Sequence, residues 1–214
     1  MSTVLKSIVL TGGPCGGKTS ALSALKARFE AQGWHVCVLP ETATFLMQAN
    51  LNITDPAVPQ LTFQRAVLDH QLACEEIFAA AARDSGWEKT LLLCDRGILD
   101  GMAYCTPEDF CTLLADHGMT LEDGLTRYDG VFHLVTSAKG AEAAYGTGTN
   151  ALRYEGLEQA RRTDDATLAA WQGCPVLQVI ENRGTFAEKL EDLAGRVQQV
   201  LNAPAPCLYG GAEG

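Results

Sequence analysis

The chain has 214 residues, of which 47% are hydrophobic, and carries a formal net charge of −10 at neutral pH. A chain of this length can bury one substantial core, so we expect a single domain over residues 1–202 and a flexible tail over 203–214. The acidic balance argues against a nucleic-acid partner, because phosphate backbones are bound by basic surfaces. The lack of a long apolar run argues against a membrane span.

Eight cysteines occur without a C-x-x-C pair, and several lie in apolar runs. This pattern is typical of buried, reduced thiols rather than of a disulfide framework. We therefore expect a soluble, cytoplasmic protein.

The most specific motif lies near the start of the chain. Residues 12–19 read G-G-P-C-G-G-K-T, which matches the phosphate-binding pattern G-x-x-x-x-G-K-[ST] at every fixed position. An apolar run at 7–10 precedes the motif and apolar residues at helical spacing follow it, so strand, loop and helix come in the required order. Glycines let several backbone N–H groups converge on one anion. The residues expected to bind a nucleotide are Gly12, Gly13, Gly16, Gly17, Lys18, Thr19 and Ser20.

Two side chains of this motif have expected roles of their own. Lys18 would reach the outer phosphates as a point charge and take part in catalysis, and the Thr19 hydroxyl would bind a Mg²⁺ ion that bridges them. The positive end of the helix that begins near Lys18 adds to this attraction. The alternative interpretation is a glycine-rich turn without a ligand.

A second strand is expected at residues 35–39, and Glu41 follows it after one proline. Open α/β sheets bind ligands at the carboxyl ends of their strands, so Glu41 is a candidate catalytic base and substrate contact. Its position fits equally well an acidic residue that favours the N-terminus of the next helix. The turn-rich segment 50–59 is expected to be a loop.

A long helix is expected from about residue 60 to residue 83. Its core-facing apolar stripe would consist of Phe63, Val67, Cys74 and Phe78. A second face carries Gln64, Gln71 and Glu75 at spacings of seven and four. These three polar side chains would either line a cleft and hydrogen-bond a polar substrate or form the solvated side of an amphipathic helix.

A third strand is expected at residues 90–94, and it ends in D-R-G. Because a buried parallel strand that ends in an acidic residue typically presents it to a bound metal, Asp95 is the expected carboxylate on the magnesium side. Arg96 would bind a phosphate or orient the substrate, unless it forms an ion pair with Asp95 or Asp100. Asp100 and Tyr104, four residues apart, are either substrate contacts or ordinary helix caps.

Short helices are expected at 108–116 and 121–127, before a fourth strand at 130–135 that contains His133. A single histidine in such a strand is interpreted as a packed core residue rather than a ligand.

The segment 136–172 is expected to form a lid, because glycine-rich sequence precedes a helix that carries arginines. A mobile arginine can neutralise transferring phosphates and exclude water, and we assign this catalytic role to Arg153. Arg161 and Arg162 are alternatives for the residue that reaches the phosphates. A helix whose arginines pair with neighbouring carboxylates in solvent is the competing interpretation.

A fifth strand is expected at residues 175–180, and Asn182 and Arg183 follow it at the edge where a nucleotide base would bind. The final helix has a regular apolar stripe, which we expect to face the core. It consists of Phe186, Leu190, Leu193, Val197 and Leu201.

Together these motifs resemble the AAA-type P-loop domain shared by the ribosylnicotinamide kinase part of the bacterial NAD regulator and by the TRPL-translocation-defect protein. The resemblance extends to about residue 201. It implies a P-loop NTPase with a five-stranded parallel sheet in the order 2-3-1-4-5, flanked by helices, that binds ATP and Mg²⁺. It rests on L-T-G-G-P-C-G-G-K-T at 10–19, P-E-T-A-T at 40–44, the polar residues of the long helix, L-L-L-C-D-R-G at 91–97 and N-x-x-R-x-E at 150–155.

The D-R pair at 95–96 is also similar to the signature after the third strand of thymidylate and deoxynucleoside kinases. In deoxynucleoside kinases a glutamate after the second strand acts as the base towards the substrate hydroxyl, and Glu41 matches that place. Two positions depart from the pattern, because Gly97 replaces a larger residue and P-E at 40–41 replaces E-P.

The resemblance implies transfer of the terminal phosphoryl group of ATP to a small acceptor, and the leading hypothesis is a kinase of a nucleoside-like or other hydroxyl-bearing metabolite. The alternatives are a stand-alone NTPase and a nucleotide-binding regulator that acts through a protein or lipid partner. The oligomeric state stays open, with a homodimer as one option.

Overall fold

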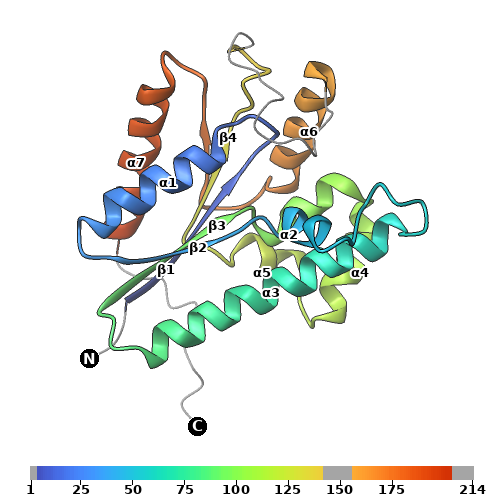
Figure 1. The fold of residues 1–214 in the computed structure, drawn as a ribbon, viewed down its shortest axis with the longest axis horizontal. Coiled ribbons are helices and arrows are strands. Elements are labelled where there is room, and N and C mark those ends of the chain that lie inside the picture. The colour runs from blue at the N-terminus through green and yellow to red at the C-terminus, as the bar shows by residue number, and fades with distance from the viewer. Residues whose placement is uncertain (1–3, 142–155, 204–214) are drawn as a thin grey trace.

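The computed structural model describes residues 4–141 and 156–203, which form five parallel strands with helices on both sides (Figure 1). The sheet has the order β2-β3-β1-β4-β5, so the predicted order is confirmed. Its strands are β1 Val4–Thr11, β2 His35–Leu39, β3 Lys89–Asp95, β4 Gly130–Leu134 and β5 Leu177–Ile180.

The register of the sheet brings the carboxyl ends of three strands together. Near the end of β1, Leu10 is level with Asp95 of β3 on one side and Phe132 of β4 on the other. The chain segments that leave β1, β3 and β4 therefore emerge at one edge, where open α/β sheets bind their ligands. Segments 12–17, 96–97 and 135–139 meet at this edge.

Seven α-helices and one 3₁₀ helix surround the sheet in the described ranges. They are α1 Lys18–Glu30, α2 Thr42–Gln48, α3 Gln60–Asp84, η1 Ile98–Tyr104, α4 Pro107–Asp116, α5 Leu121–Leu125, α6 Leu157–Ala170 and α7 Phe186–Asn202. None of these helices is both long and apolar enough to cross a lipid bilayer. The seven cysteines within the same ranges are free thiols.

The two faces of the sheet bury separate cores. Alternate residues of a strand point to opposite faces, so Ile8 and Val9 of β1 belong to different clusters. On one face α1 and α7 lie together, and on the other lies the long helix α3 (Figure 1). Phe29 of α1 packs in the first cluster, and Leu68 of α3 packs in the second.

The buried face of α3 differs from the predicted one. Phe63 is buried as predicted, but Val67, Cys74 and Phe78 are only partly buried. The side chains that α3 buries are those of Phe63, Gln64, Leu68, Gln71, Glu75, Ala79 and Ala82. The predicted polar row therefore lies on the inner side of the helix, and the interpretation as a solvated face is wrong.

The apolar stripe of α7 also needs one correction. Leu193, Val197 and Leu201 are buried and Leu190 is partly buried, but Phe186 is 46% exposed. Phe186 is the first residue of the helix and lies against the loop that follows β1, beyond the edge of the core. The prediction that it faces the core is wrong.

Candidate active site

The loop between β1 and α1 is shaped so that its glycines cannot be replaced without strain. Gly12 and Gly17 have φ angles of 124° and 88°, which are unfavourable for residues with a side chain. A Cβ atom on Gly16 would lie 2.6 Å from the carbonyl oxygen of Leu134. The loop is therefore packed directly against the end of β4.

The N-terminus of α1 has the features of an anion-binding site. Gly17 occupies the N-cap position without a side-chain cap, so the first N–H groups of the helix have no capping side chain. Thr19 and Ser20 are exposed in the first turn. Lys18 is buried, and its ammonium donates to the carbonyl oxygens of Gly12 and Gly13, both at 2.9 Å. These features fit a bound phosphate group at this loop.

A buried carboxylate from α6 holds one side of the loop. Asp164 is 1% exposed and accepts hydrogen bonds from the backbone N–H groups of Gly13 at 2.9 Å and Thr136 at 3.1 Å. Lys139 Nζ lies 2.8 Å from Asp164 Oδ2, and Nε2 of the fully buried His133 lies 3.2 Å from Oδ1. Burial by itself would raise the pKa of Asp164, but the nearby His133 and the hydrogen-bonded Lys139 hold it well below its ordinary value.

A buried ammonium from α7 holds the other side. Lys189 Nζ donates to the carbonyl oxygens of Gly16 at 3.1 Å and Val135 at 2.8 Å, and to Asn182 Oδ1 at 2.7 Å. Burial lowers the pKa of Lys189 to about 8, although the negative charge of Asp164 acts in the opposite direction. Neither Asp164 nor Lys189 was predicted, because no local sequence motif marks a residue that supports a loop from a distant helix.

Arg96 connects the loop to the segment after β2. Its Nε donates to Glu41 Oε1 at 2.5 Å, and its Nη1 lies 3.2 Å from Asp100 Oδ2 and 3.3 Å from the carbonyl oxygen of Gly12. The backbone of Arg96 is left-handed, with a φ angle of 78°. Such strain in a residue with a side chain persists where the surroundings determine its position, and it is frequent at functional sites.

The charge of Arg96 is stabilised by its neighbours. Burial by itself would lower the pKa of this guanidinium, but Tyr104, Glu41 and Asp100 raise it above its already high ordinary value. Of the predicted ion pairs, the structure contains the one with Asp100. The second carboxylate partner of Arg96 is Glu41, which sequence spacing had not indicated.

Asp100 is held by two further donors. Thr11 Oγ1 donates to its carboxylate at 2.7 Å, and Trp171 Nε1 donates at 2.6 Å. The indole of Trp171 also explains the departure at Gly97, because a Cβ atom there would lie 2.6 Å from the ring. The fully buried Trp171 therefore fills the space that a larger side chain would take.

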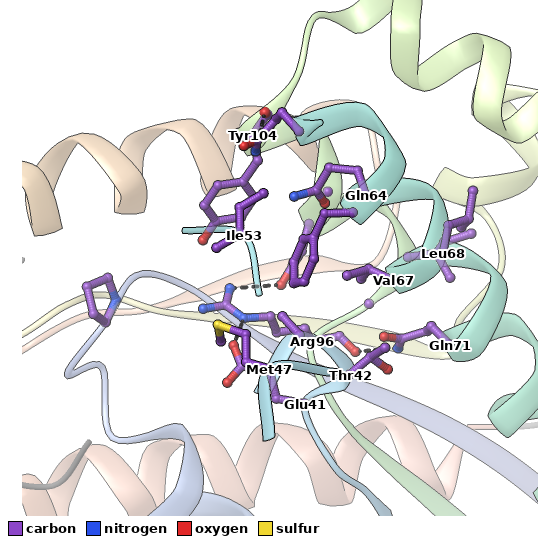
Figure 2. A pocket seen from close by; sticks show the side chains of 18 of the residues that line it. Glu41, Thr42, Met47, Ile53, Gln64, Val67, Leu68, Gln71, Arg96 and Tyr104 are labelled. Atoms are coloured by element: carbon purple, nitrogen blue, oxygen red, sulfur yellow. Dashed lines mark hydrogen bonds and ion pairs between the residues drawn. The ribbon is translucent and has the colours of Figure 1, made fainter. Parts of the chain in front are cut away.

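A cavity of about 380 Å³, which we call the Arg96 cavity, is lined by Arg96, Glu41, Gly97 and Asp100 among other residues. In Figure 2, Arg96 extends into it with Glu41 on one side and Tyr104 across from it. Pro14 of the glycine loop is also part of the wall, so the cavity opens beside that loop. The predicted substrate contacts that line it are Glu41, Gln64, Gln71, Arg96, Asp100 and Tyr104.

Glu75 does not line the Arg96 cavity. Its carboxylate accepts hydrogen bonds from Tyr128 Oη at 2.6 Å and Arg127 Nε at 2.7 Å. Gln71, one turn before it, donates from Nε2 to the carbonyl oxygen of Arg96 at 2.8 Å. The position predicted for Glu75 is therefore corrected, because this side chain supports the wall from behind and is bound by protein groups.

The remaining predicted residues lie around the loop. Asp95 is the last residue of β3 and is partly buried. Asn182 Nδ2 donates to the carbonyl oxygens of Thr136 at 2.7 Å and Lys139 at 2.8 Å, which occupies both amide hydrogens. Arg183 lines a second cavity, of about 480 Å³, between the end of β5 and α7.

The predicted lid arginines fall into two groups. Arg153 lies outside the described residues, within the segment 142–155. In α6, Arg161 Nε donates to the carbonyl oxygen of Ala138 at 2.7 Å, and the exposed Arg162 forms an ion pair with Glu158. This ion pair of Arg162 is expected for the competing interpretation, in which the arginines of a solvent-facing helix pair with neighbouring carboxylates.

The strand order and the glycine loop between β1 and α1 define a P-loop NTPase fold. Among known families, the one described as an AAA domain matches residues 7–189, and the chain belongs to this family. A comparison with curated proteins gave no match. P-loop domains bind a nucleoside triphosphate, generally ATP with Mg²⁺, and hydrolyse it or transfer its phosphoryl group.

Proposed function

We propose that the protein is an ATP-dependent phosphotransferase that transfers the terminal phosphoryl group of ATP to a hydroxyl group of a small metabolite. One observation carries this proposal: a cavity with its own carboxylate and guanidinium opens beside the phosphate loop. Pro14 belongs to both, and Arg96 reaches the loop carbonyl of Gly12 at 3.3 Å. A hydrolase needs room for water alone, whereas a cavity of about 380 Å³ has room for an acceptor.

Glu41 is the proposed base in this reaction. Its Oε1 accepts from Arg96 and its Oε2 accepts from Thr44 Oγ1 at 2.6 Å, which orients the carboxylate at the cavity wall. Each carboxylate oxygen can accept more than one hydrogen bond, so the acceptor hydroxyl can still donate to Glu41. Glu41 would take the hydroxyl proton as the oxygen attacks the terminal phosphorus in line with the departing ADP.

The loop would hold the donor. Backbone N–H groups at its glycines and at the start of α1 would bind the phosphates, and Lys18 would exchange its carbonyl partners for phosphate oxygens. Arg96 would stabilise the negative charge on the transferred group from the acceptor side. Arg153 remains our proposed lid arginine, with Arg161 and Arg162 as alternatives.

Magnesium fits this arrangement as a companion of the nucleotide. No three His, Cys, Asp or Glu side chains in the described ranges lie close enough to hold a metal ion by themselves. The exposed Thr19 hydroxyl and the Asp95 carboxylate lie at the ends of α1 and β3 that border the loop, and we propose that they hold the ion together with phosphate oxygens. When bound, Mg²⁺ neutralises negative charge on the outer phosphates.

The walls of the Arg96 cavity indicate the kind of acceptor. Met47, Ile53 and Phe63 contribute apolar surface, while Gln64 and Gln71 contribute amides. A neutral, partly apolar molecule that carries hydroxyl and amide-like groups is complementary to this lining. A nucleoside-like metabolite meets this description.

Product analysis by mass spectrometry, after incubation with Mg-ATP and a metabolite extract, tests the proposal. We expect a phosphorylated product and ATP consumption that depends on the acceptor. Glu41→Gln should lower kcat by about 10²- to 10⁴-fold, because it removes the base, while ATP affinity is retained. Thr44→Ala, which removes a hydrogen bond but leaves the Glu41 carboxylate in place, should cause a much smaller loss. ATP hydrolysis that no acceptor accelerates and that Glu41→Gln retains would contradict the proposal and favour an NTPase or regulator.

A further inference from the structure

Phe186 occupies an unusual position for the first residue of an amphipathic helix. Phe186 is 46% exposed, although Leu193, Val197 and Leu201 of the same stripe are buried. The ring lies against Gly17, where an added Cβ atom would come within 2.9 Å of Phe186 Cζ. Because Gly17 lacks a side chain, the aromatic ring lies directly beside the point where the phosphate loop becomes α1.

The start of α7 is fixed firmly enough to hold this ring in place. The side chains of Thr185 and Glu188 form a reciprocal capping box at the N-terminus of the helix. One turn after Phe186, Lys189 donates to the carbonyl oxygen of Gly16. The capping box orders the first turn of α7, and the Lys189 hydrogen bond joins that turn to the phosphate loop, which reduces the motion of the ring relative to the loop.

The topology indicates which part of a nucleotide would reach Phe186. The Arg96 cavity lies on the side of β1 where β3 and β2 end, whereas Phe186 follows β5 on the opposite side. This step rests on the proposed function: the terminal phosphate must point towards the cavity to be transferred. The ribose and base would then leave the loop in the opposite direction, past the ends of β4 and β5.

Asn182 is poorly placed to read the base at this end. Both of its amide hydrogens are donated to carbonyl oxygens of the segment after β4, and its Oδ1 accepts from Lys189. The side chain of Phe186 has no hydrogen-bonding groups to satisfy and offers apolar surface. Aromatic rings bind nucleobases by stacking, and this contact tolerates any base.

We infer that Phe186 is the stacking platform for the base of the donor nucleotide. The ligand is a nucleoside triphosphate, and the contact accepts adenine and guanine alike. Stacking on a half-exposed ring beside the loop adds affinity for the nucleoside part while the loop binds the triphosphate. Phe186 therefore contributes to binding of ATP and GTP but not to binding of the phosphate chain itself.

Calorimetric titrations with Mg-ATP, Mg-GTP and Mg-tripolyphosphate, in the absence of any acceptor, test this assignment. Phe186→Ala should raise the Kd of both nucleotides by about 5- to 100-fold and leave the Kd of tripolyphosphate unchanged. Phe186→Trp should retain nucleotide affinity. The matched control is Phe45→Ala, since Phe45 is also 46% exposed but stacks on His70; it should leave all three Kd values unchanged.

Two outcomes would overturn the inference. An equal loss for ATP and tripolyphosphate in Phe186→Ala would mean that the ring only shapes the phosphate loop. An unchanged Kd for ATP would mean that the base does not touch the ring. Since no acceptor is present, either result leaves the proposed phosphoryl transfer standing, whereas a wild-type protein that does not bind ATP would contradict the proposed function itself.

Discussion

The phosphate loop takes its shape from consecutive residues, 12–17, whereas the Arg96 cavity takes its walls from α2, α3, η1 and the end of β3. Backbone conformation and glycine spacing shape the first region, and Asp164 and Lys189 support it from distant helices. Ion pairs between distant side chains determine the second, with Arg96 bound to both Glu41 and Asp100. Substitutions in the loop should therefore act on the donor nucleotide, and substitutions in the cavity should act on the acceptor and on the fold.

The largest expected effect in this comparison comes from Arg96→Met. The change leaves the carboxylates of Glu41 and Asp100 buried without their shared cation, so the free energy of unfolding should fall by about 3–5 kcal/mol. Urea denaturation measures this loss. Arg65→Met is the matched control, because Arg65 pairs with Asp116 on the exposed surface and should contribute at most about 1 kcal/mol. Equal losses in the two variants would mean that the cavity does not depend on its buried ion pairs.

Two glycine substitutions should separate the regions by function. Gly16→Ala drives a methyl group against the carbonyl of Leu134, and Gly97→Ala drives one against Trp171, so each should cost about 1–3 kcal/mol of stability. Gly16→Ala should raise the Kd of ATP, whereas Gly97→Ala should raise the KM of the acceptor and leave ATP binding intact. Titration calorimetry and steady-state kinetics distinguish these results.

Gly195→Ala provides the control for both glycine variants. A Cβ atom on Gly195 meets open space within helix α7, so this change should raise stability by up to about 1 kcal/mol. If Gly16→Ala and Gly97→Ala impair the same ligand, the division of the site into donor and acceptor regions is wrong.

The smallest expected effect concerns pH and the support of the loop by Lys189. Its pKa is about 8 in the folded protein, below the ordinary 10.5, so the unfolded chain binds more protons between these values. Its contribution to stability should therefore increase as pH rises from about 8 to about 10. ATP affinity should fall over the same range, because the loop loses the ammonium beside Gly16.

Comparing wild type with Lys189→Met separates the effect of the Lys189 ammonium from that of other groups that change charge in the same pH range. The difference in unfolding free energy between wild type and variant should grow with pH, as followed by urea denaturation at several pH values. A difference that stays constant from pH 7 to pH 10 would show that Lys189 does not change protonation there.

The sequence by itself indicates the edge of the sheet where the site lies. The glycine motif is contiguous, and apolar strands that end in polar residues mark the carboxyl ends of a parallel sheet, so Glu41, Asp95 and Arg96 could be placed at that edge. The strand order came from the resemblance to P-loop domains and is confirmed. These features follow from local sequence patterns and from the order of strands and helices along the chain.

Tertiary structure alone decided which side chains meet. Arg96 and Glu41 are 55 residues apart, Asp164 and Gly13 are 151 apart, and Lys189 and Gly16 are 173 apart. Sequence periodicity cannot predict such pairs, because each contact forms only when helices and strands that are distant in the sequence pack together.

The two errors on helix faces have the same cause. On α3, hydrophobic periodicity predicted Phe63 correctly but placed the partly buried Val67, Cys74 and Phe78 in the core. It also left open whether Gln71 and Glu75 are buried, because it cannot foresee that Arg96, Arg127 and Tyr128 supply their hydrogen-bonding partners. On α7, it placed Phe186 in the core. The apolar pattern of a helix shows which side chains are stabilised by burial. The packing of the helices and strands determines which of these side chains are in fact covered.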